Sequence, residues 1–243
     1  MRWGFVIHVA INGFSRLVTF AEASTNNEAR TVLNHFLSAV ETFGQPLRVR
    51  TDHGGENSDV WRNMVTTNGE QDVIVGSSVR NQRVERFNFD INVNVTRQFA
   101  AIFRDLEFEG ILSAANDTDL FCLQYVYAPR INKVLHEFVA AHNNHVISTG
   151  GSSTPLQLFH ANRHLTELHS SLLHVDPYPT LNVEDLLNDG SLPHVEVTTR
   201  TCPLSADDFF GLQETIDPLT VSLVNGKDLF HQTVEFFGTC LLQ

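Results

Sequence analysis

Apolar and polar residues follow strand-like and helix-like periods in turn over the first part of the chain. Residues 4–11 (GFVIHVAI) are apolar almost throughout, which is typical of a strand covered on both faces. Residues 16–22 (RLVTFAE) predict a second strand, and Asn12-Gly13 between the two predicts a turn. Residues 29–43 then place their apolar side chains on one stripe at helical spacing. We therefore expect a hairpin followed by an amphipathic helix.

The next segment continues the alternation of strands and helices. Residues 47–51 predict a short strand that ends at Asp52, residues 56–67 predict a helix, and residues 72–76 (DVIVG) predict another short strand. Strands that alternate with helices in this way favour an α/β fold, in which helices flank a mixed sheet. The first strand, apolar and central, is expected to lie in that sheet.

Residues 79–104 fit two different patterns. Residues 87–96 alternate apolar and polar side chains, which indicates a strand, and Asn, Val and Thr are weak helix formers. Phe87, Ile91, Val95 and Phe99 also keep a helical stripe. Local propensity alone favours the strand.

The pattern changes again toward the C-terminus. Residues 118–128 and 131–143 predict two helices that are broken or kinked at Pro129, and residues 155–174 predict a further helix. Beyond Asp176, prolines, scattered acids and short apolar runs replace regular periodicity. We divide the chain into a core, 1–175, and an acidic accessory region, 176–243, which we expect to be separate or loosely attached.

Composition indicates a soluble, intracellular protein. Hydrophobic residues make up 42% of the chain and charged residues 18%, and no apolar run reaches the ~20 residues that a membrane span needs. The three cysteines are far apart and odd in number, which favours reduced thiols in the nucleus or cytoplasm and gives no zinc pattern. We expect no membrane partner.

The charge distribution bears on the choice of partner. The net charge is −12, but residues 1–175 carry 14 Lys and Arg against 17 Asp and Glu (−3), and residues 176–243 carry 2 against 11 (−9). Nucleic-acid binding depends on local basic clusters rather than on the total charge. Arg80, Arg83 and Arg86 form such a cluster, although a solvated helix face would look the same.

Acidic residues at the ends of predicted strands are candidates for metal chemistry. Phosphoryl transfer on nucleic acid can use two divalent ions, which are held by carboxylates from separate elements. Asp52 directly follows a strand, and Glu85 begins the next long segment. A third acid would be expected after the first strand, where the chain has Asn12.

Five fragments in a fixed order carry a family resemblance. The chain resembles the integrase core domain of transposon-derived proteins, a group similar to retroviral integrases with Asp-Asp-Glu chemistry, over roughly residues 4–160. The fragments are INGFSRL (11–17), RVRTDHGGEN (48–57), SVRNQRVER (78–86), PRINKVLHEF (129–138) and NNH…TPLQL (143–158).

The resemblance implies a fold, a set of roles and a partner. It implies an RNase H-like fold with residues 79–104 helical, and with Asp52 and Glu85 as the second and third catalytic acids and ligands of Mg²⁺ or Mn²⁺. Asn12 then occupies the degenerate first position. DNA is the implied partner, a homo-oligomer is possible, and no small-molecule substrate is expected.

Ordinary structural roles compete with these functional ones. Asp52 before Gly54 could cap a turn, Glu85 could pair with a nearby arginine, and Asn12 is a natural turn residue. Glu56, near Asp52, could supply a missing carboxylate, but a helix N-terminus often carries Glu anyway. Two functions follow: a DNA strand-transfer enzyme with weakened or lost activity, or a non-catalytic module that binds nucleic acid or protein.

Overall fold

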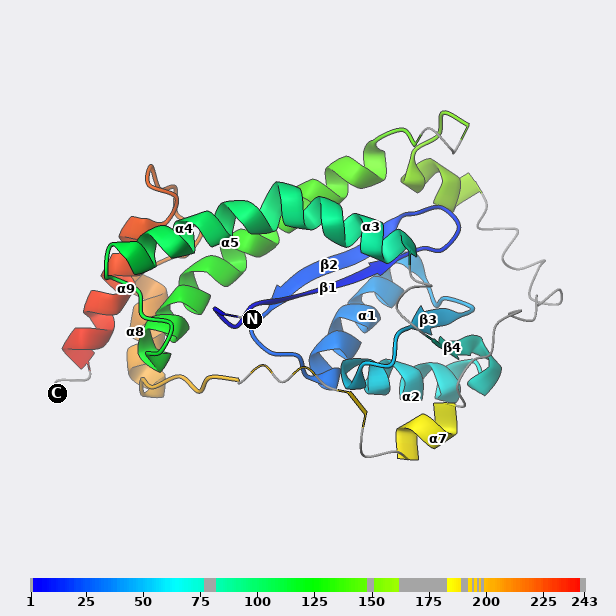
Figure 1. Ribbon diagram of the computed structural model, residues 1–243, viewed down its shortest axis with the longest axis horizontal. Helices are drawn as coiled ribbons and strands as arrows, with labels where there is room; N and C mark the ends of the chain where they lie inside the picture. The colour runs from blue at the N-terminus through cyan, green and yellow to red at the C-terminus, as the bar shows by residue number, and fades with distance from the viewer. Residues whose placement is uncertain are drawn as a thin grey trace.

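Two small sheets and a larger set of helices make up the fold (Figure 1). β1 (Val6–Ile11) and β2 (Val18–Ser24) form an antiparallel hairpin, and β3 (Val49–Thr51) pairs in parallel with β4 (Val73–Val75). The α/β class is confirmed. The expected mixture of parallel and antiparallel pairing is present, but it is divided between two sheets instead of being joined in one. This computed structural model describes residues 2–76, 82–147, 151–161, 183–188, 192–193, 195, 197 and 199–240.

Helices supply most of the regular structure. None of those in the described part of the chain is long and apolar enough to cross a membrane. In chain order they are α1 (Ala29–Phe43), η1 (Gly55–Asn57), α2 (Ser58–Thr67), η2 (Glu70–Asp72), α3 (Gln82–Ile91), η4 (Asn92–Thr96), α4 (Arg97–Phe108), α5 (Asp117–Asn144), α7 (Val183–Asn188), α8 (Ala206–Thr215) and α9 (Lys227–Cys240).

The β1–β2 hairpin lies between two hydrophobic cores. The main core packs one face of the hairpin against α3, α4, α5 and the C-terminal helices. The second core joins α1, α2, β4 and α7, and Phe20 of β2 packs against it from the other face. Successive side chains of a strand point to opposite faces, so an apolar strand such as β1 suits a position between two cores.

Two asparagines of α5 replace a neighbouring strand along β2. The side chain of Asn132 pairs with the backbone N–H and carbonyl of Ala23 (2.7 and 3.0 Å), and Asn143 pairs in the same way with Val18 (2.9 and 2.9 Å). Asn132 and Asn143 are about 16.5 Å apart along an α-helix, and Val18 and Ala23 are about 16.5 Å apart along a strand. The matching lengths let both amides pair at once, so α5 satisfies the edge of β2.

Residues 82–108 form one continuous helical stretch, in which a π-helical turn, η4, separates α3 from α4. The helix implied by the resemblance is confirmed for these residues, and the strand favoured by local propensity is wrong. Phe87, Ile91 and Val95 are buried, whereas Phe89 is 54% exposed. Apolar residues at a strict spacing of four drift by about 40° per step around an α-helix of 3.6 residues per turn, and the wider π turn offsets part of that drift.

Of the break or kink predicted at Pro129, the break is absent. α5 runs through Pro129 as a single helix, and Asn116 caps its N-terminus by accepting hydrogen bonds from the backbone N–H groups of Thr118 and Asp119. Proline removes one backbone hydrogen bond from a helix. Buried side chains on both sides of it, Tyr127 and Ile131, hold the helix in the main core across this point.

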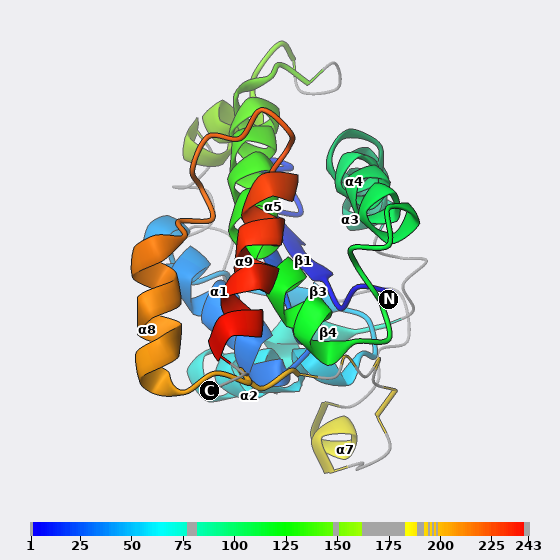
Figure 2. The same ribbon diagram turned by 90° about the vertical axis from the view of Figure 1, so that its left-hand side faces the viewer.

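The C-terminal helices belong to the main core. Figure 2 shows α9 alongside α5, and buried Leu229, Phe230 and Phe237 of α9 join the α5 side chains there. The expectation of a loosely attached region is therefore wrong for α8 and α9. Each of these helices packs an apolar face into the main core, and its acidic side chains lie on the other faces. The proposed boundary at residue 175 lies outside the described residues.

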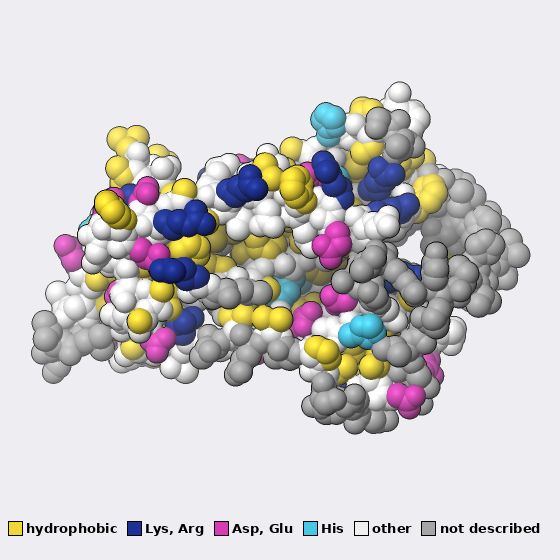
Figure 3. All heavy atoms as spheres, in the orientation of Figure 1, with side chains coloured by type: hydrophobic (Ala, Val, Ile, Leu, Met, Phe, Trp, Pro, Cys, Tyr) yellow, Lys and Arg dark blue, Asp and Glu magenta, His cyan; other side chains and the backbone are white. Residues whose placement is uncertain are grey.

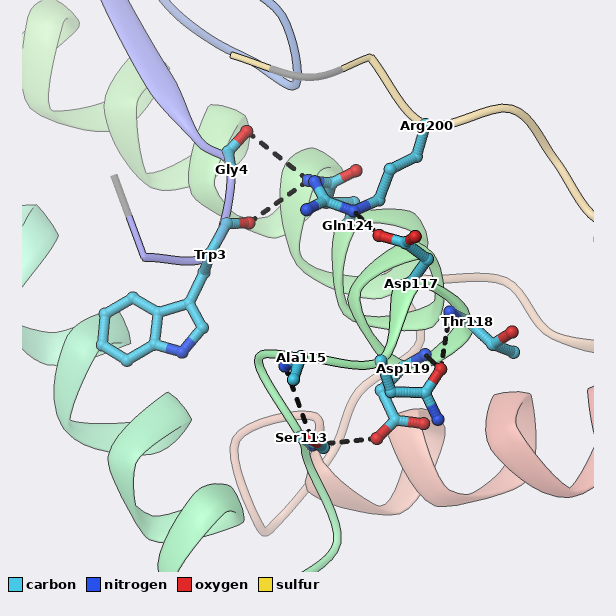
Figure 4. A network of polar contacts seen from close by, with 10 residues as sticks. Trp3, Gly4, Ser113, Ala115, Asp117, Thr118, Asp119, Gln124 and Arg200 are labelled. Carbon is cyan, nitrogen blue, oxygen red and sulfur yellow. Dashed lines mark hydrogen bonds and ion pairs between the residues drawn. The ribbon is translucent and has the colours of Figure 1, made fainter. Parts of the chain in front are cut away.

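Polar contacts also attach the segment that precedes α8 (Figure 4). Arg200 pairs with Asp117 at the start of α5 (3.1 Å). About two turns further along α5, Gln124 donates hydrogen bonds to the carbonyls of Trp3 (3.2 Å) and Gly4 (3.5 Å). The beginning of the chain, the start of α5 and the C-terminal segment thus meet at one end of the molecule.

Candidate active site

Asn12 forms the centre of the turn between β1 and β2. Its Oδ1 accepts hydrogen bonds from the backbone N–H of Phe14 (3.1 Å), the backbone N–H of Ser15 (2.8 Å) and the hydroxyl of Ser15 (3.0 Å). Its backbone N–H donates to the carbonyl of Leu17 (2.7 Å). The turn thus uses the side-chain oxygen, and the NH₂ group is the part of Asn12 left for other contacts.

The end of α5 fixes this turn in place. His142 donates from Nε2 to the carbonyl of Arg16 (3.1 Å), next to the paired Asn143 and Val18. Arg16 has a positive φ of 63°, which is uncommon for a residue with a side chain. Contacts with α5 therefore hold the turn in a shape that the hairpin alone would not favour.

Asp52 follows β3 and lies in a second polar loop. Its Oδ1 accepts from Nδ2 of Asn57 (3.1 Å) and from the backbone N–H of Gly54 (3.5 Å). The strand before it is anchored by the fully buried Trp61, whose indole N–H donates to the Thr51 hydroxyl (2.8 Å). Asp52 therefore caps its own turn through Oδ1, as its sequence context suggested. Its second oxygen, Oδ2, takes no part in these two hydrogen bonds.

Glu56 lies beside Asp52. Nδ2 of Asn57 also donates to Glu56 Oε1 (3.5 Å), so one amide bridges the two carboxylates. The Glu56 carboxylate folds so closely over the Gly54 backbone that a Cβ atom at position 54 would clash with it. A side chain at position 54 would push it away.

Glu85 lies exposed in the first turn of α3. Two residues later, Phe87 packs edge-on against His142 (4.8 Å between ring centroids), the residue that bonds Arg16 in the Asn12 turn. Shared contacts with the end of α5 thus connect the start of α3 to the turn that contains Asn12.

The predicted basic cluster is partly described. Arg83 and Arg86 are exposed on α3, and Arg80 lies outside the described residues. Arg86 pairs with Asp90 (3.3 Å) and lies over the ring of Phe89, 5.4 Å from its centroid. Arg83 has no ion-pair partner within the described chain.

The three predicted site positions lie on elements that pack in different cores. Asn12 follows β1 and Glu85 lies on α3, and both elements pack in the main core, whereas Asp52 follows β3, which packs against the second core. The strands that end at Asn12 and Asp52 do not pair with each other in the described sheets, where β1 pairs only with β2, and β3 only with β4. Within the described ranges, no three His, Cys, Asp or Glu side chains form a group that could hold a metal.

Two neighbouring histidines, His8 and His35, were not singled out from the sequence. They lie at the face of the hairpin that points away from the main core. His8 of β1 is 8% exposed, its ring lies 5.9 Å from that of His35 between centroids, and Nε2 has no hydrogen-bond partner in the described part of the chain. Burial, with a smaller contribution from His35, lowers the pKa of His8 to about 4. The sequence does contain a signal for this buried histidine, because His8 is the one polar residue inside an otherwise apolar predicted strand.

Comparison with solved structures gives a distant likeness. The HTLV-2 integrase catalytic core domain, solved in complex with magnesium in a trimeric form, matches with 18% sequence identity and a TM-score of 0.42. The match covers 64% of this chain and 85% of that chain. No curated protein matches.

A family model gives the decisive match. The model of the integrase core domain matches residues 1–172, well over half of the chain. This range includes the Asn12 turn, Asp52, Glu85 and all of α5. The match confirms the resemblance that the five sequence fragments carry. The chain belongs to the integrase core domain family.

Proposed function

We propose that this chain derives from a DNA strand-transfer enzyme and that its metal-dependent activity is weak or lost. The carrying observation is the hydrogen bonding of Asn12, whose only side-chain oxygen accepts from three donors of its own turn. Asp52 and Glu85 are the proposed remaining acidic ligands. The NH₂ group of Asn12 would face a cation with positive hydrogens.

The donor set does not fit two divalent ions. Two such ions bring four positive charges, against which Asp52 and Glu85 supply two negative charges, and Mg²⁺ prefers charged oxygen ligands in near-octahedral geometry. Glu56 could add a third carboxylate beside Asp52, with which it shares the Asn57 amide. We derive no strand-transfer step from this arrangement. Contact with DNA through Arg80, Arg83 and Arg86 remains part of the proposal.

Restoring the acid at position 12 tests the proposal. In Asn12→Asp, one carboxylate oxygen can keep the three turn hydrogen bonds, and the other replaces the NH₂ group with a charged ligand. The attraction between a carboxylate and a divalent ion ~3 Å away is roughly 3 kcal/mol even at the dielectric of water. We therefore expect Mg²⁺ or Mn²⁺ to bind about 100-fold more tightly.

Calorimetric metal titration of both proteins measures this change. Asn26→Asp is the matched control, because Asn26 Oδ1 also accepts turn hydrogen bonds, from the Glu28 backbone N–H (3.1 Å) and the Thr31 hydroxyl (2.7 Å). It should leave metal affinity unchanged. Equal affinity in wild type and Asn12→Asp would show that position 12 is not in the metal site. Robust DNA nicking by wild type, abolished by Asp52→Ala, would overturn the loss of activity.

A further inference from the structure

The outer face of α3 and α4 carries a row of exposed arginines that extends well beyond the predicted cluster. Arg97 and Arg104 on α4 continue the row from Arg83 and Arg86 on α3, and all four are exposed. Figure 3 shows Lys and Arg side chains recurring along these helices on the face that it displays. From Arg83 to Arg104 the row covers ~31 Å at the rise of an α-helix.

The acids at the C-terminal end of α4, and Glu109 directly after it, contact cations from other segments. Asp105 and Glu109 both contact Lys227 of α9 (3.6 and 2.8 Å), and Glu107 pairs with Arg2 (2.9 Å). In contrast, neither Arg97 nor Arg104 has an acidic partner among the described residues. These ion pairs leave both guanidinium groups without a paired carboxylate in the described part of the chain.

Between Arg97 and Arg104, the aromatic side chains of α4 pack into the main core, whereas Phe108 at the end of α4 and Phe89 on α3 are 94% and 54% exposed. Phe103 is buried and Phe99 packs against it and Tyr127, so both belong to the main core. Single-stranded nucleic acid is usually held by exposed aromatic rings on which bases stack, in addition to basic side chains. A straight row of arginines without exposed rings between Arg97 and Arg104 instead fits the phosphates of a stiff duplex.

We propose that Arg97 and Arg104 extend the DNA contact of this chain along α4, as a backbone-binding track for double-stranded DNA. Arg97 and Arg104 follow Glu85 on the same helical stretch and are not among the proposed metal ligands. A duplex has a phosphate every ~3.4 Å along each strand, so ~31 Å of helix can follow about nine base-pair steps. The inference rests on the proposed function only in that both place DNA on this chain.

Salt-dependent DNA binding tests the track. The full chain is titrated into a fluorescently labelled duplex of about 20 base pairs, and anisotropy is measured over a series of salt concentrations. Arg97→Ala/Arg104→Ala should lower the slope of log affinity against log salt by about 1.8, which corresponds to about 60-fold weaker binding at ~0.1 M salt. Alanine preserves helix propensity at both exposed positions, and circular dichroism checks the fold.

The matched control removes two exposed arginines elsewhere. Arg30→Ala/Arg62→Ala changes the net charge equally on α1 and α2, which pack in the second core. It should keep the wild-type salt slope. An equal loss in both double variants, an unchanged slope in Arg97→Ala/Arg104→Ala, or tighter binding of single-stranded than of duplex DNA would overturn the track. Absence of DNA binding by wild type would also overturn it, whereas the metal titrations judge position 12 without DNA.

Discussion

Replacing Asn143 with alanine should destabilise the protein, because it leaves two buried backbone groups of β2 without partners. The Asn143 side chain is buried, and it pairs with the N–H and the carbonyl of Val18, both at 2.9 Å. A buried polar group that loses its partner costs roughly 1–3 kcal/mol. With two such groups, we expect the free energy of unfolding to fall by about 2–5 kcal/mol.

The neighbouring residue provides the control. Asn144 is exposed and donates only to the carbonyl of Ala140 in its own helix (2.9 Å). Asn144→Ala should therefore change stability by less than about 0.5 kcal/mol, as surface substitutions usually do. Asn143→Asp should be at least as harmful as Asn143→Ala, because a carboxylate cannot donate to the Val18 carbonyl.

Urea unfolding followed by circular dichroism measures all three variants under the same conditions. The slope of the transition should stay constant if only stability changes. If Asn143→Ala and Asn144→Ala unfold at the same urea concentration, the Asn143 amide does not replace a strand partner, and our account of how α5 satisfies the edge of β2 is wrong.

Two further predictions concern buried side chains. Burial holds the pKa of His8 at about 4, below its unfolded value of 6.5, so unfolded chains bind the proton first as the pH falls. Stability should therefore decrease between pH 6.5 and 4, by up to about 3 kcal/mol, and urea titrations of His8→Phe should lack this part of the decrease. Phe230→Ala should cost about 3–5 kcal/mol, since the ring is fully buried in the main core, whereas Phe210→Ala at a 60% exposed ring should cost little. Similar unfolding midpoints for these last two variants would contradict the packing of α9 against α5.

Local patterns were sufficient for much of the fold. The apolar runs of β1 and β2, the stripe of α1 and the strand before Asp52 all lie close to their predicted positions. Over residues 82–108 two periods shared Phe87, Ile91 and Val95, so periodicity alone could not choose between them. A strand would place Phe89 on the same buried face as Phe87 and Ile91, yet Phe89 is 54% exposed. This exposure follows from how the helices pack, so the sequence alone did not reveal it.

Features that depend on distant residues were not predictable in this way. Asn143 and Val18 are 125 residues apart, and no local pattern marks their pairing. The packing of α9 left a readable signal, an apolar stripe of Leu229, Phe230 and Phe237, which the strong negative charge of the region concealed. At the candidate site, the residue type and position of Asn12 were enough to predict that it forms a turn. The three groups that donate hydrogen bonds to it could be identified only in the folded turn.

The π turn of η4 gives one helical stretch room for an extra residue. It contains residues 92–96, between Glu85 on α3 and Arg97 on α4. A π turn is in effect one residue inserted into an α-helix. Loss of one residue there would restore a regular helix and rotate Glu85 only slightly relative to α4, because five residues at ~4.4 per turn sweep nearly the same angle as four at ~3.6. The helical stretch could thus lose this residue while Glu85 and α4 keep their faces, so the pattern of buried side chains constrains this segment more strictly than its length does.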